Sequence, residues 1–353
     1  MTRKLIVLVV VPAVFGISIA RGQQAEQAGT AYGLAEVAAS EYQWTGVAVS
    51  REGRIFVNFP LWSKDVPVSV GELDELGEII PYPNEEWNVW NPALDPAEHF
   101  VCVQSVHIDR ANRLWVLDPA SPYLRGVVQG GPKLVQIDIG TDEIVRVYQF
   151  DSTVAGTSSY LNDVRVEIKT NTAFITDSGS GAIVVLDLDT GHSRRLLEDH
   201  PSTRAEDSVL TIGGNQLPIR VHADGIALDA RGGFLYYQAL TGRTLYRIRT
   251  EKLRDRSIKG AELGSFVERV GETGPSDGLL HKEGFIYLTS IEQNAIRRIK
   301  PGGDVETVVQ DSLLEWPDSF ALGPQGTLYV TTSRIAFPPG AGPCRLFELR
   351  PAP

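Results

Sequence analysis

Short stretches in which apolar and polar residues alternate recur along most of the chain. In SYLNDVRVEIKTNTAFITDSG (159–179), two alternating runs are separated by Thr170-Asn171, which is typical of a β-hairpin. Hardly any stretch longer than about ten residues has a helical period. The pattern therefore predicts a protein built almost entirely from β-strands.

This hairpin pattern occurs six times. Each copy has an anchor residue, a strand, a turn with Gly or Asn, and a second strand centred on an aromatic residue. The anchors are Thr45, Gln104, Asp163, Asp224, Asp277 and Asp318. The aromatic residues, which follow the anchors by 10 to 12 positions, are Phe56, Trp115, Phe174, Tyr236, Tyr287 and Tyr329. We expect these aromatic side chains to pack between neighbouring units.

The intervals between the anchors leave room for two further strands, as in KLVQIDI (133–139) and EIVRVYQF (143–150). Six four-stranded units predict an all-β fold, a six-bladed β-propeller, with a β-sandwich or a two-domain β protein as the alternative. The sixth unit is one strand short, and residues 34–39 could supply it and close the ring. We therefore expect one propeller domain over residues 44–350, and an N-terminal segment, residues 21–43, that contributes this strand.

The first 20 residues have the features of a secretory signal peptide. Arg3 and Lys4 precede an apolar run over residues 5–19, and small residues stand before a cut after Ala20. The run is shorter than the ~20 residues that a spanning helix needs, although an uncleaved membrane anchor is the alternative. We therefore expect an exported protein, secreted or periplasmic, with no membrane span once residues 1–20 are removed.

The composition is that of an acidic globular protein, with 42% hydrophobic residues and a net charge of −11. Nucleic-acid binding is not expected, because phosphates require a basic surface. An acidic surface instead attracts cations, either metal ions or amines. The two cysteines, Cys102 and Cys344, are interpreted as small buried side chains, and a disulfide between them is the alternative that export allows.

The anchors carry the candidate chemistry. In a propeller the first strand of each blade lines the central channel, so the six anchors and Asn162 are expected to surround one mouth. His222, two residues before Asp224, approaches the same mouth. Carboxylates that converge on one cavity raise one another's pKa values unless a cation compensates. Such a cluster is typical of a cation site or an acid–base site, although Asp-Gly is also an ordinary turn pair.

Several sequence blocks resemble the yellow / major royal jelly protein family, in a bacterial-type form. They lie in order along residues 45–250, and fainter repeats follow. They include TGVAVSREGRIFVNFPLWSKDVPVSV (45–70), SVHIDRANRLWVLD (105–118), YLNDVRVE (160–167) and HADGIALDARGGFLYYQALTGRTLYRI (222–248). The resemblance implies secretion and a six-bladed propeller. It does not fix one chemistry, because members are linked to pigment formation, biogenic-amine binding and nutrition. Ala111 and Gly131 stand where animal members would carry cysteines.

A more distant resemblance to gluconolactonase/regucalcin-like propellers implies a divalent metal at the channel mouth. In those proteins a Glu of the first blade, an Asn of a later blade and an Asp of an Asp-Gly pair hold the metal. Asn162, Asp224 and Asp277 occupy comparable positions, whereas Thr45 stands in place of the Glu. Asp318, or Gln104 through its carbonyl oxygen, could compensate, because calcium takes about six to eight oxygen ligands.

The first functional hypothesis is a protein that binds a small cationic or hydroxylated molecule at the channel mouth. Carboxylates would neutralise the charge of the ligand, and apolar or aromatic side chains would cover its body. The residues expected to contact this ligand are Trp62, Gln104, Asp163 and Asp318.

The second hypothesis is a metal-dependent hydrolase, specifically a lactonase. Calcium or another divalent metal, held by Asn162, Asp224 and Asp277, would polarise the lactone carbonyl and orient water. Asp224 or His222 would act as the catalytic base. A structural or partner-binding propeller is a third alternative, with residues 199–218 as a partner site or a lid.

Overall fold

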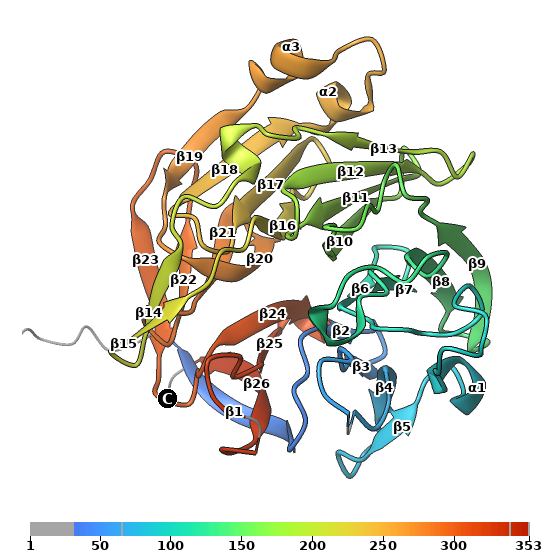
Figure 1. Cartoon of the computed structure of the whole chain (residues 1–353). Helices are drawn as coiled ribbons and strands as arrows, with labels where there is room; N and C mark the ends of the chain where they lie inside the picture. Colours follow the sequence, from blue (N-terminus) through green and yellow to red (C-terminus); the bar gives the residue numbers. More distant parts are fainter. Residues whose placement is uncertain (1–31, 65, 339, 352–353) are drawn as a thin grey trace, which may run out of the picture.

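The computed structural model describes residues 32–64, 66–338 and 340–351. Six small sheets stand like blades around a central channel, and each consists of four antiparallel strands (Figure 1). The predicted six-bladed β-propeller is therefore confirmed. The expected signal peptide, residues 1–20, lies outside the described part of the chain. No helix within that part is long and apolar enough to cross a membrane.

The strands follow each blade from the channel outward. Blade 1 consists of β2 (Val47–Val49), β3 (Ile55–Asn58), β4 (Val70–Leu73) and β5 (Ile79–Pro81). Blade 2 consists of β6 (Ser105–Ile108), β7 (Arg113–Asp118), β8 (Lys133–Asp138) and β9 (Glu143–Gln149). Blade 3 consists of β10 (Leu161–Glu167), β11 (Thr172–Asp177), β12 (Ala182–Asp187) and β13 (Ser193–Leu196). Blade 4 consists of β16 (Ala223–Leu228), β17 (Phe234–Ala239), β18 (Thr244–Arg249) and β19 (Glu268–Glu272). Blade 5 consists of β20 (Ser276–Lys282), β21 (Phe285–Ser290), β22 (Ala295–Ile299) and β23 (Val305–Gln310). Blade 6 consists of β24 (Pro317–Leu322), β25 (Leu328–Thr332), β26 (Cys344–Pro351) and β1 (Tyr32–Ser40).

The two ends of the described chain meet in blade 6. β1 pairs antiparallel with β26, from Tyr32 opposite Pro351 to Ser40 opposite Cys344. Residues 34–39, the segment considered for the missing strand, lie inside β1. The first strand in sequence is thus the outermost strand of the last blade, and it covers an edge of β26 that would otherwise present unpaired backbone groups.

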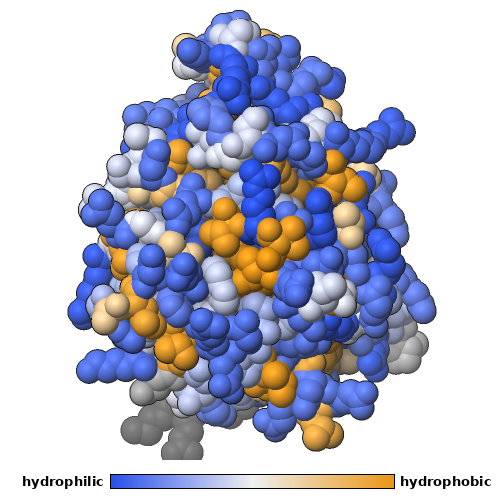
Figure 2. Space-filling view, turned by 90° about the vertical axis from the view of Figure 1, so that its right-hand side faces the viewer, coloured by the Kyte–Doolittle hydropathy of each residue, from blue (hydrophilic) through white to orange (hydrophobic). Residues whose placement is uncertain are grey.

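The hydrophobic core lies between the blades. Buried residues of adjoining blades form six clusters, one at each blade-to-blade contact. Each cluster includes or contacts one of the six repeated aromatic residues; five of these are buried and Tyr329 is partly buried. Burying one such ring contributes about 1.5–3 kcal/mol, so the aromatic row holds neighbouring blades together. One outer face of the molecule is mostly hydrophilic, with separate hydrophobic groups (Figure 2).

A short hairpin and a few helical turns decorate the ring. The hairpin, β14 (Val209–Ile212) and β15 (Asn215–Pro218), lies within residues 199–218, the segment considered as a partner site or a lid. It packs on a separate cluster that contains Leu240, Ile291 and Trp316. The helical turns are α1 (Glu85–Asn88), α2 (Thr250–Arg254), α3 (Gly260–Gly264), η1 (Pro122–Leu124), η2 (Pro201–Thr203) and η3 (Pro324–Gly326).

Both cysteines are free and buried. The interpretation as small buried side chains is therefore confirmed, and the alternative disulfide is absent from the described structure. Burial raises the pKa of Cys102 to about 12 and that of Cys344 to about 11. Both side chains are accordingly neutral thiols at physiological pH.

Candidate functional site

Most of the anchors meet at one mouth of the channel, where the inner strands begin. They line a cavity of about 360 Å³, called the acidic pocket below. Its polar lining includes Gln104, Asn162, Asp224, Asp277 and Asp318. Small hydroxyl side chains and Arg220 also line it, and its aromatic and apolar walls include Trp62, Tyr160, Trp316, Leu124, Ile219, Val221, Leu240 and Ile335.

A β-bulge in each of four inner strands places the anchors. Each of these strands holds one more residue than its partner strand at this point, which leaves the anchor unpaired and re-aims its side chain. The register shifts fall between Leu161 and Val164, Ala223 and Ile226, Ser276 and Leu279, and Pro317 and Phe320. The sequence repeat of an acid or amide at the strand entry is therefore the repeat of a bulge.

Threonine hydroxyls of the second strands accept hydrogen bonds from backbone amides that these bulges leave without a strand partner. The amide of Asp163 donates to Thr176 Oγ1 at 3.2 Å, and the amide of Gly278 donates to Thr289 Oγ1 at 2.7 Å. The amide of Ser319 donates to Thr331 in the same way, at 3.1 Å. Unpaired buried amides are costly, so these threonines are part of the device that aims the anchors.

The glycines after Asp224 and Asp277 are required by close approach of neighbouring inner strands. A Cβ atom at Gly225 would lie 2.1 Å from the carbonyl oxygen of Asp277, and one at Gly278 would lie 2.1 Å from that of Asp318. Both Asp-Gly pairs lie inside strands. The alternative reading of these pairs as ordinary turns is therefore wrong. Glycine is required at both positions because no side chain fits where the strands converge.

A chain of hydrogen bonds runs around the acidic pocket through all six blades. Trp62 Nε1 donates to Tyr160 Oη at 2.9 Å, and Tyr160 donates to Gln104 Oε1 at 2.8 Å. Gln104 Nε2 lies 3.5 Å from Asn162 Oδ1.

The chain continues from Asn162, whose Nδ2 donates to Asp224 Oδ2 at 2.9 Å. When one of the two holds a proton, the carboxyls of Asp224 and Asp277 are hydrogen-bonded to each other. Trp316 Nε1 then donates to Asp277 Oδ2 at 2.7 Å. This circuit fixes the orientation of Gln104, Asn162, Asp224 and Asp277, while Asp318 accepts a separate hydrogen bond from the hydroxyl of Ser319 at 3.0 Å.

Three carboxyls of the pocket are buried without a cationic partner. Asp224, Asp277 and Asp318 are 2%, 7% and 3% exposed. None of them takes part in an ion pair formed within the described ranges. An exposed arginine, Arg220, lies at the rim. Such a cluster either holds protons or needs a cation.

The pKa values of these carboxyls are raised accordingly. Burial, followed by the charges of Asp277, Asp318 and Asp163, raises the pKa of Asp224 well above its ordinary value. Burial raises the pKa of Asp277 to about 7, although the indole N–H of Trp316 opposes the shift. Burial and the charge of Asp277 raise the pKa of Asp318 as well. The hydrogen-bonded carboxyls of Asp224 and Asp277 can therefore share a proton near neutral pH.

Not every expected site residue reaches the pocket. Asp163 lies below it, where Arg165 Nη1 contacts its Oδ1 at 3.3 Å. His222 does not line the pocket; its Nδ1 accepts the amide hydrogen of Ala205 at 2.9 Å, and burial lowers its pKa. Thr45 is also turned away, since its hydroxyl donates to the carbonyl oxygen of Gln104 at 2.7 Å.

Two aromatic residues of the circuit, Tyr160 and Trp316, were not expected from the sequence. Tyr160 stands two positions before Asn162 and Trp316 two positions before Asp318, as His222 does before Asp224. Comparing this position across the blades would have predicted both, because the residue before a bulged strand entry lies at the rim of the same mouth.

The pocket meets only part of what a divalent metal requires. Carboxylate and amide oxygens are suitable ligands for calcium. However, Asn162 presents its nitrogen to Asp224, and Trp316 donates a hydrogen to Asp277. No group of three or more His, Cys, Asp or Glu side chains in the described ranges is arranged to hold a metal ion. As arranged, the residues do not fit a calcium cage, and we derive no metal-dependent step.

Sequence comparison identifies relatives of the chain in two insects. The chain is 23% identical over 233 residues to major royal jelly protein 1 of Apis mellifera, which covers 61% of this chain and 51% of that protein. It is 27% identical over 156 residues to dopaminechrome tautomerase of Drosophila melanogaster, 40% of this chain and 33% of that protein. The chain thus spans about half, or less, of these relatives.

Structural comparison agrees with the fold. A gluconolactonase from Xanthomonas campestris superposes with a TM-score of 0.55 at 12% identity, over 92% of this chain and 89% of that one. At this identity the likeness concerns the propeller fold alone. The model of the major royal jelly protein family matches residues 101–335, two thirds of the sequence. The chain therefore belongs to the major royal jelly protein family.

Proposed function

We propose that the acidic pocket binds a small organic cation. The observation that carries the proposal is the set of three buried carboxyls, Asp224, Asp277 and Asp318, which have no cationic partner in the described structure. An ammonium group placed among them would replace the protons that these carboxyls otherwise retain. The exchange offsets the burial and the mutual repulsion that raise their pKa values.

The walls of the pocket favour a cation with an apolar body. Trp62 and Tyr160 stand on one side, and Leu240 and Ile335 also line the cavity. Aromatic and apolar side chains around a few fixed polar groups are typical of small-molecule sites, and aromatic faces also attract cations. An arylalkylamine, with one ammonium group and one ring, meets both requirements.

The test is a calorimetric titration with phenethylamine, with phenethyl alcohol as its uncharged counterpart. We expect phenethylamine to bind and the alcohol to bind at least about tenfold more weakly, because a hydroxyl cannot replace a charge among carboxylates. Asp277→Asn should weaken binding of the amine. Equal binding of both compounds, or unchanged binding by Asp277→Asn, would reject the proposal.

A second candidate is proton transfer on a bound substrate. The hydrogen-bonded carboxyls of Asp224 and Asp277 have raised pKa values, that of Asp277 to about 7, which suits a group that gives and takes a proton near neutral pH. The relative that is a dopaminechrome tautomerase supports this candidate. Consumption of dopaminechrome, followed by absorbance, should be faster with the protein than with Asp277→Asn. No acceleration over buffer would reject it.

Metal-dependent lactone hydrolysis is the remaining alternative for the same carboxyls. It requires Asn162 to turn its side-chain oxygen inward, because the nitrogen now faces Asp224. It also requires Asp224 and Asp277 to lose the protons that their raised pKa values favour. After EDTA treatment, calcium at a hundredfold excess over its dissociation constant should stabilise the protein by about 2.7 kcal/mol if it binds. A thermal midpoint that does not change with calcium would reject the lactonase.

We also propose that the chain is exported and that residues 1–20 are its signal peptide. The charged start, the apolar run and the small residues before Ala20 support this proposal. The mass of the exported protein should correspond to a chain that begins at Arg21. Retention of the first 20 residues would contradict it.

A further inference from the structure

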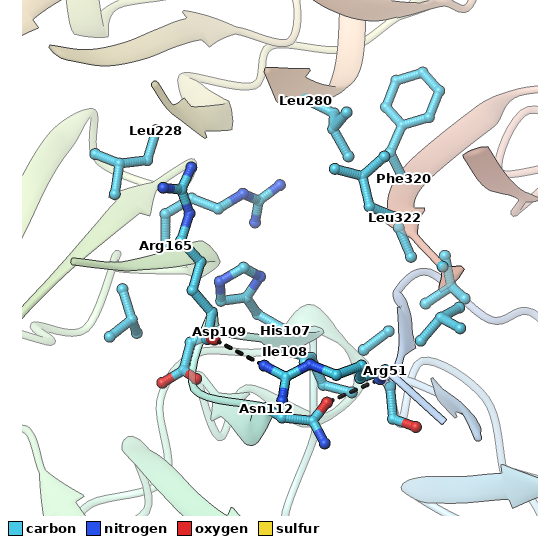
Figure 3. A pocket seen from close by; sticks show the side chains of 18 of the residues that line it. Arg51, His107, Ile108, Asp109, Asn112, Arg165, Leu228, Leu280, Phe320 and Leu322 are labelled. Atoms are coloured by element: carbon cyan, nitrogen blue, oxygen red, sulfur yellow. Dashed lines mark hydrogen bonds between the residues drawn. The ribbon is translucent and has the colours of Figure 1, made fainter. Parts of the chain in front are cut away.

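A second cavity lies at the opposite mouth of the channel, where the inner strands end. It has a volume of about 390 Å³ and is called the far pocket below. Apolar side chains from four blades form its walls: Ile108, Leu228, Leu280, Phe320 and Leu322 (Figure 3). Leu322 is 40% exposed. A concave, largely apolar lining with a few convergent polar groups is typical of a ligand site.

Arg165 stands inside this cavity with unused hydrogen-bond donors. Its Nη1 contacts Asp163 and donates to the carbonyl oxygen of Val164, and its Nη2 donates to the carbonyl oxygen of Leu279 across the channel. A guanidinium has five N–H donors. The Nε hydrogen and one Nη2 hydrogen of Arg165 therefore have no partner among the described residues.

His107 lies beside Arg165 toward the centre of the cavity (Figure 3). Burial, and then the charge of Arg165, lower the pKa of His107 well below its ordinary value. The neutral ring offers one further N–H, because one nitrogen of a neutral imidazole is always protonated. Arg165 and His107 together present donors, and no carboxylate, to a group that enters between them.

The rim carries two exposed arginines, Arg51 and Arg110. Of the two carboxylates that also line the cavity, Asp109 is paired with Arg113 and accepts from the indole of Trp115, while Asp229 caps its own turn by accepting from the amide of Gly233. The two rim arginines thus outweigh the carboxylate of Asp229, and the balance of charge at the far pocket is positive, the reverse of the acidic pocket.

From this arrangement we infer that the far pocket binds an amphipathic organic anion. Its carboxylate head accepts hydrogen bonds from Arg165 and His107, and its apolar tail lies along Leu228, Leu280 and Phe320. Arg51 and Arg110 attract the anion to the mouth. The two pockets lie at opposite mouths of the channel and share no lining residue, so they are separate sites of opposite charge preference.

The test is a calorimetric titration of the full chain with butanoate, hexanoate and octanoate, with octylammonium and octanol as head-group controls. Each buried methylene should improve the affinity by about fourfold. Octylammonium and octanol should bind at least about tenfold more weakly than octanoate at this site. No binding of octanoate, or equal binding of the three eight-carbon compounds, would overturn the inference.

Variants locate the binding. Leu322→Glu adds a negative charge at an exposed wall position, so it should fold and weaken octanoate binding by at least about tenfold. Leu76→Glu, an 87% exposed leucine outside the cavity, is the matched control and should change nothing. Equal affinity of Leu322→Glu and Leu76→Glu for octanoate would overturn the inference. Phenethylamine binding should be the same in both variants, so this result is independent of the function proposed for the acidic pocket.

Discussion

At the scale of single residues, the acidic pocket brings together three carboxyls that would repel one another if all were ionised. Asp224, Asp277 and Asp318 are buried close together, and the chain offers hydrogen-bond donors rather than positive charge to two of them. Asn162 and Trp316 hold the carboxyls in place without neutralising them. The residual electrostatic cost is what a cationic ligand would remove.

This cost makes stability depend on pH. An acid whose folded pKa exceeds its unfolded value of about 3.9 binds more protons in the folded state, so the free energy of unfolding falls as pH rises through that interval. For Asp277 the interval runs from about 4 to about 7, and its contribution is on the order of 4 kcal/mol. Urea denaturation at pH 4.5, 6 and 7.5 should show this fall, and Asp277→Asn should show a smaller one. An identical slope in the variant would contradict the raised pKa.

The sequence predicted the convergence of the carboxyls but not all of their neighbours. Repetition of Asp at one position was visible, whereas Tyr160 and Trp316 resemble ordinary core aromatics. Nothing in the sequence shows that His222 turns toward Ala205, because that contact depends on the path of a loop. Hydrogen-bond direction at Asn162 likewise follows from tertiary contacts rather than from residue type.

At the scale of elements, the bulged inner strand is the unit that makes the site. It explains why an acid or amide, and in two blades a glycine, recur at the strand entry, and why a threonine recurs on the next strand. The alternating pattern predicted the four-stranded blades and their order, but not the hairpin of β14 and β15. It did not predict the bulges, because an extra residue in one strand is visible only when the partner's register is known.

The close approach at a bulge can be tested with Gly278→Ala. The added Cβ would lie 2.1 Å from the carbonyl oxygen of Asp318, so the neighbouring strand must move. We expect a loss of about 1–3 kcal/mol in the free energy of unfolding, together with weaker phenethylamine binding. The matched control is Gly33→Ala in β1, where the new methyl group meets nothing within 4 Å. Equal stability of both variants would show that the inner strands are not so tightly packed.

At the scale of the whole molecule, a ring of blades is held by contacts between neighbours and by one closing strand. Each blade-to-blade contact has its own hydrophobic cluster, so no blade can leave without exposing two of them. The closing contact is between β1 and β26, together with the ion pair between Glu36 and Arg345 at 2.9 Å. The number of blades was predictable from six repeats, since each repeat is one sheet.

Removal of residues 32–40 tests the contribution of closure. The deletion leaves β26 with an unpaired edge, and each lost backbone hydrogen bond costs about 1 kcal/mol. For a domain of this size, the thermal midpoint should fall by roughly 10 °C or more. Adding the deleted segment as a peptide should restore part of the loss. An unchanged midpoint would mean that β1 contributes little to the ring.

If an organic cation replaces protons among Asp224, Asp277 and Asp318, protons must be released when it binds. Phenethylamine is titrated into the protein near pH 6.5 in two buffers of different ionisation enthalpy, and the difference in heat gives the number of protons released. We expect about one proton released per amine bound, and fewer with Asp277→Asn, because the pKa of Asp277 is raised to about 7 in the free protein. Binding without proton release would contradict it.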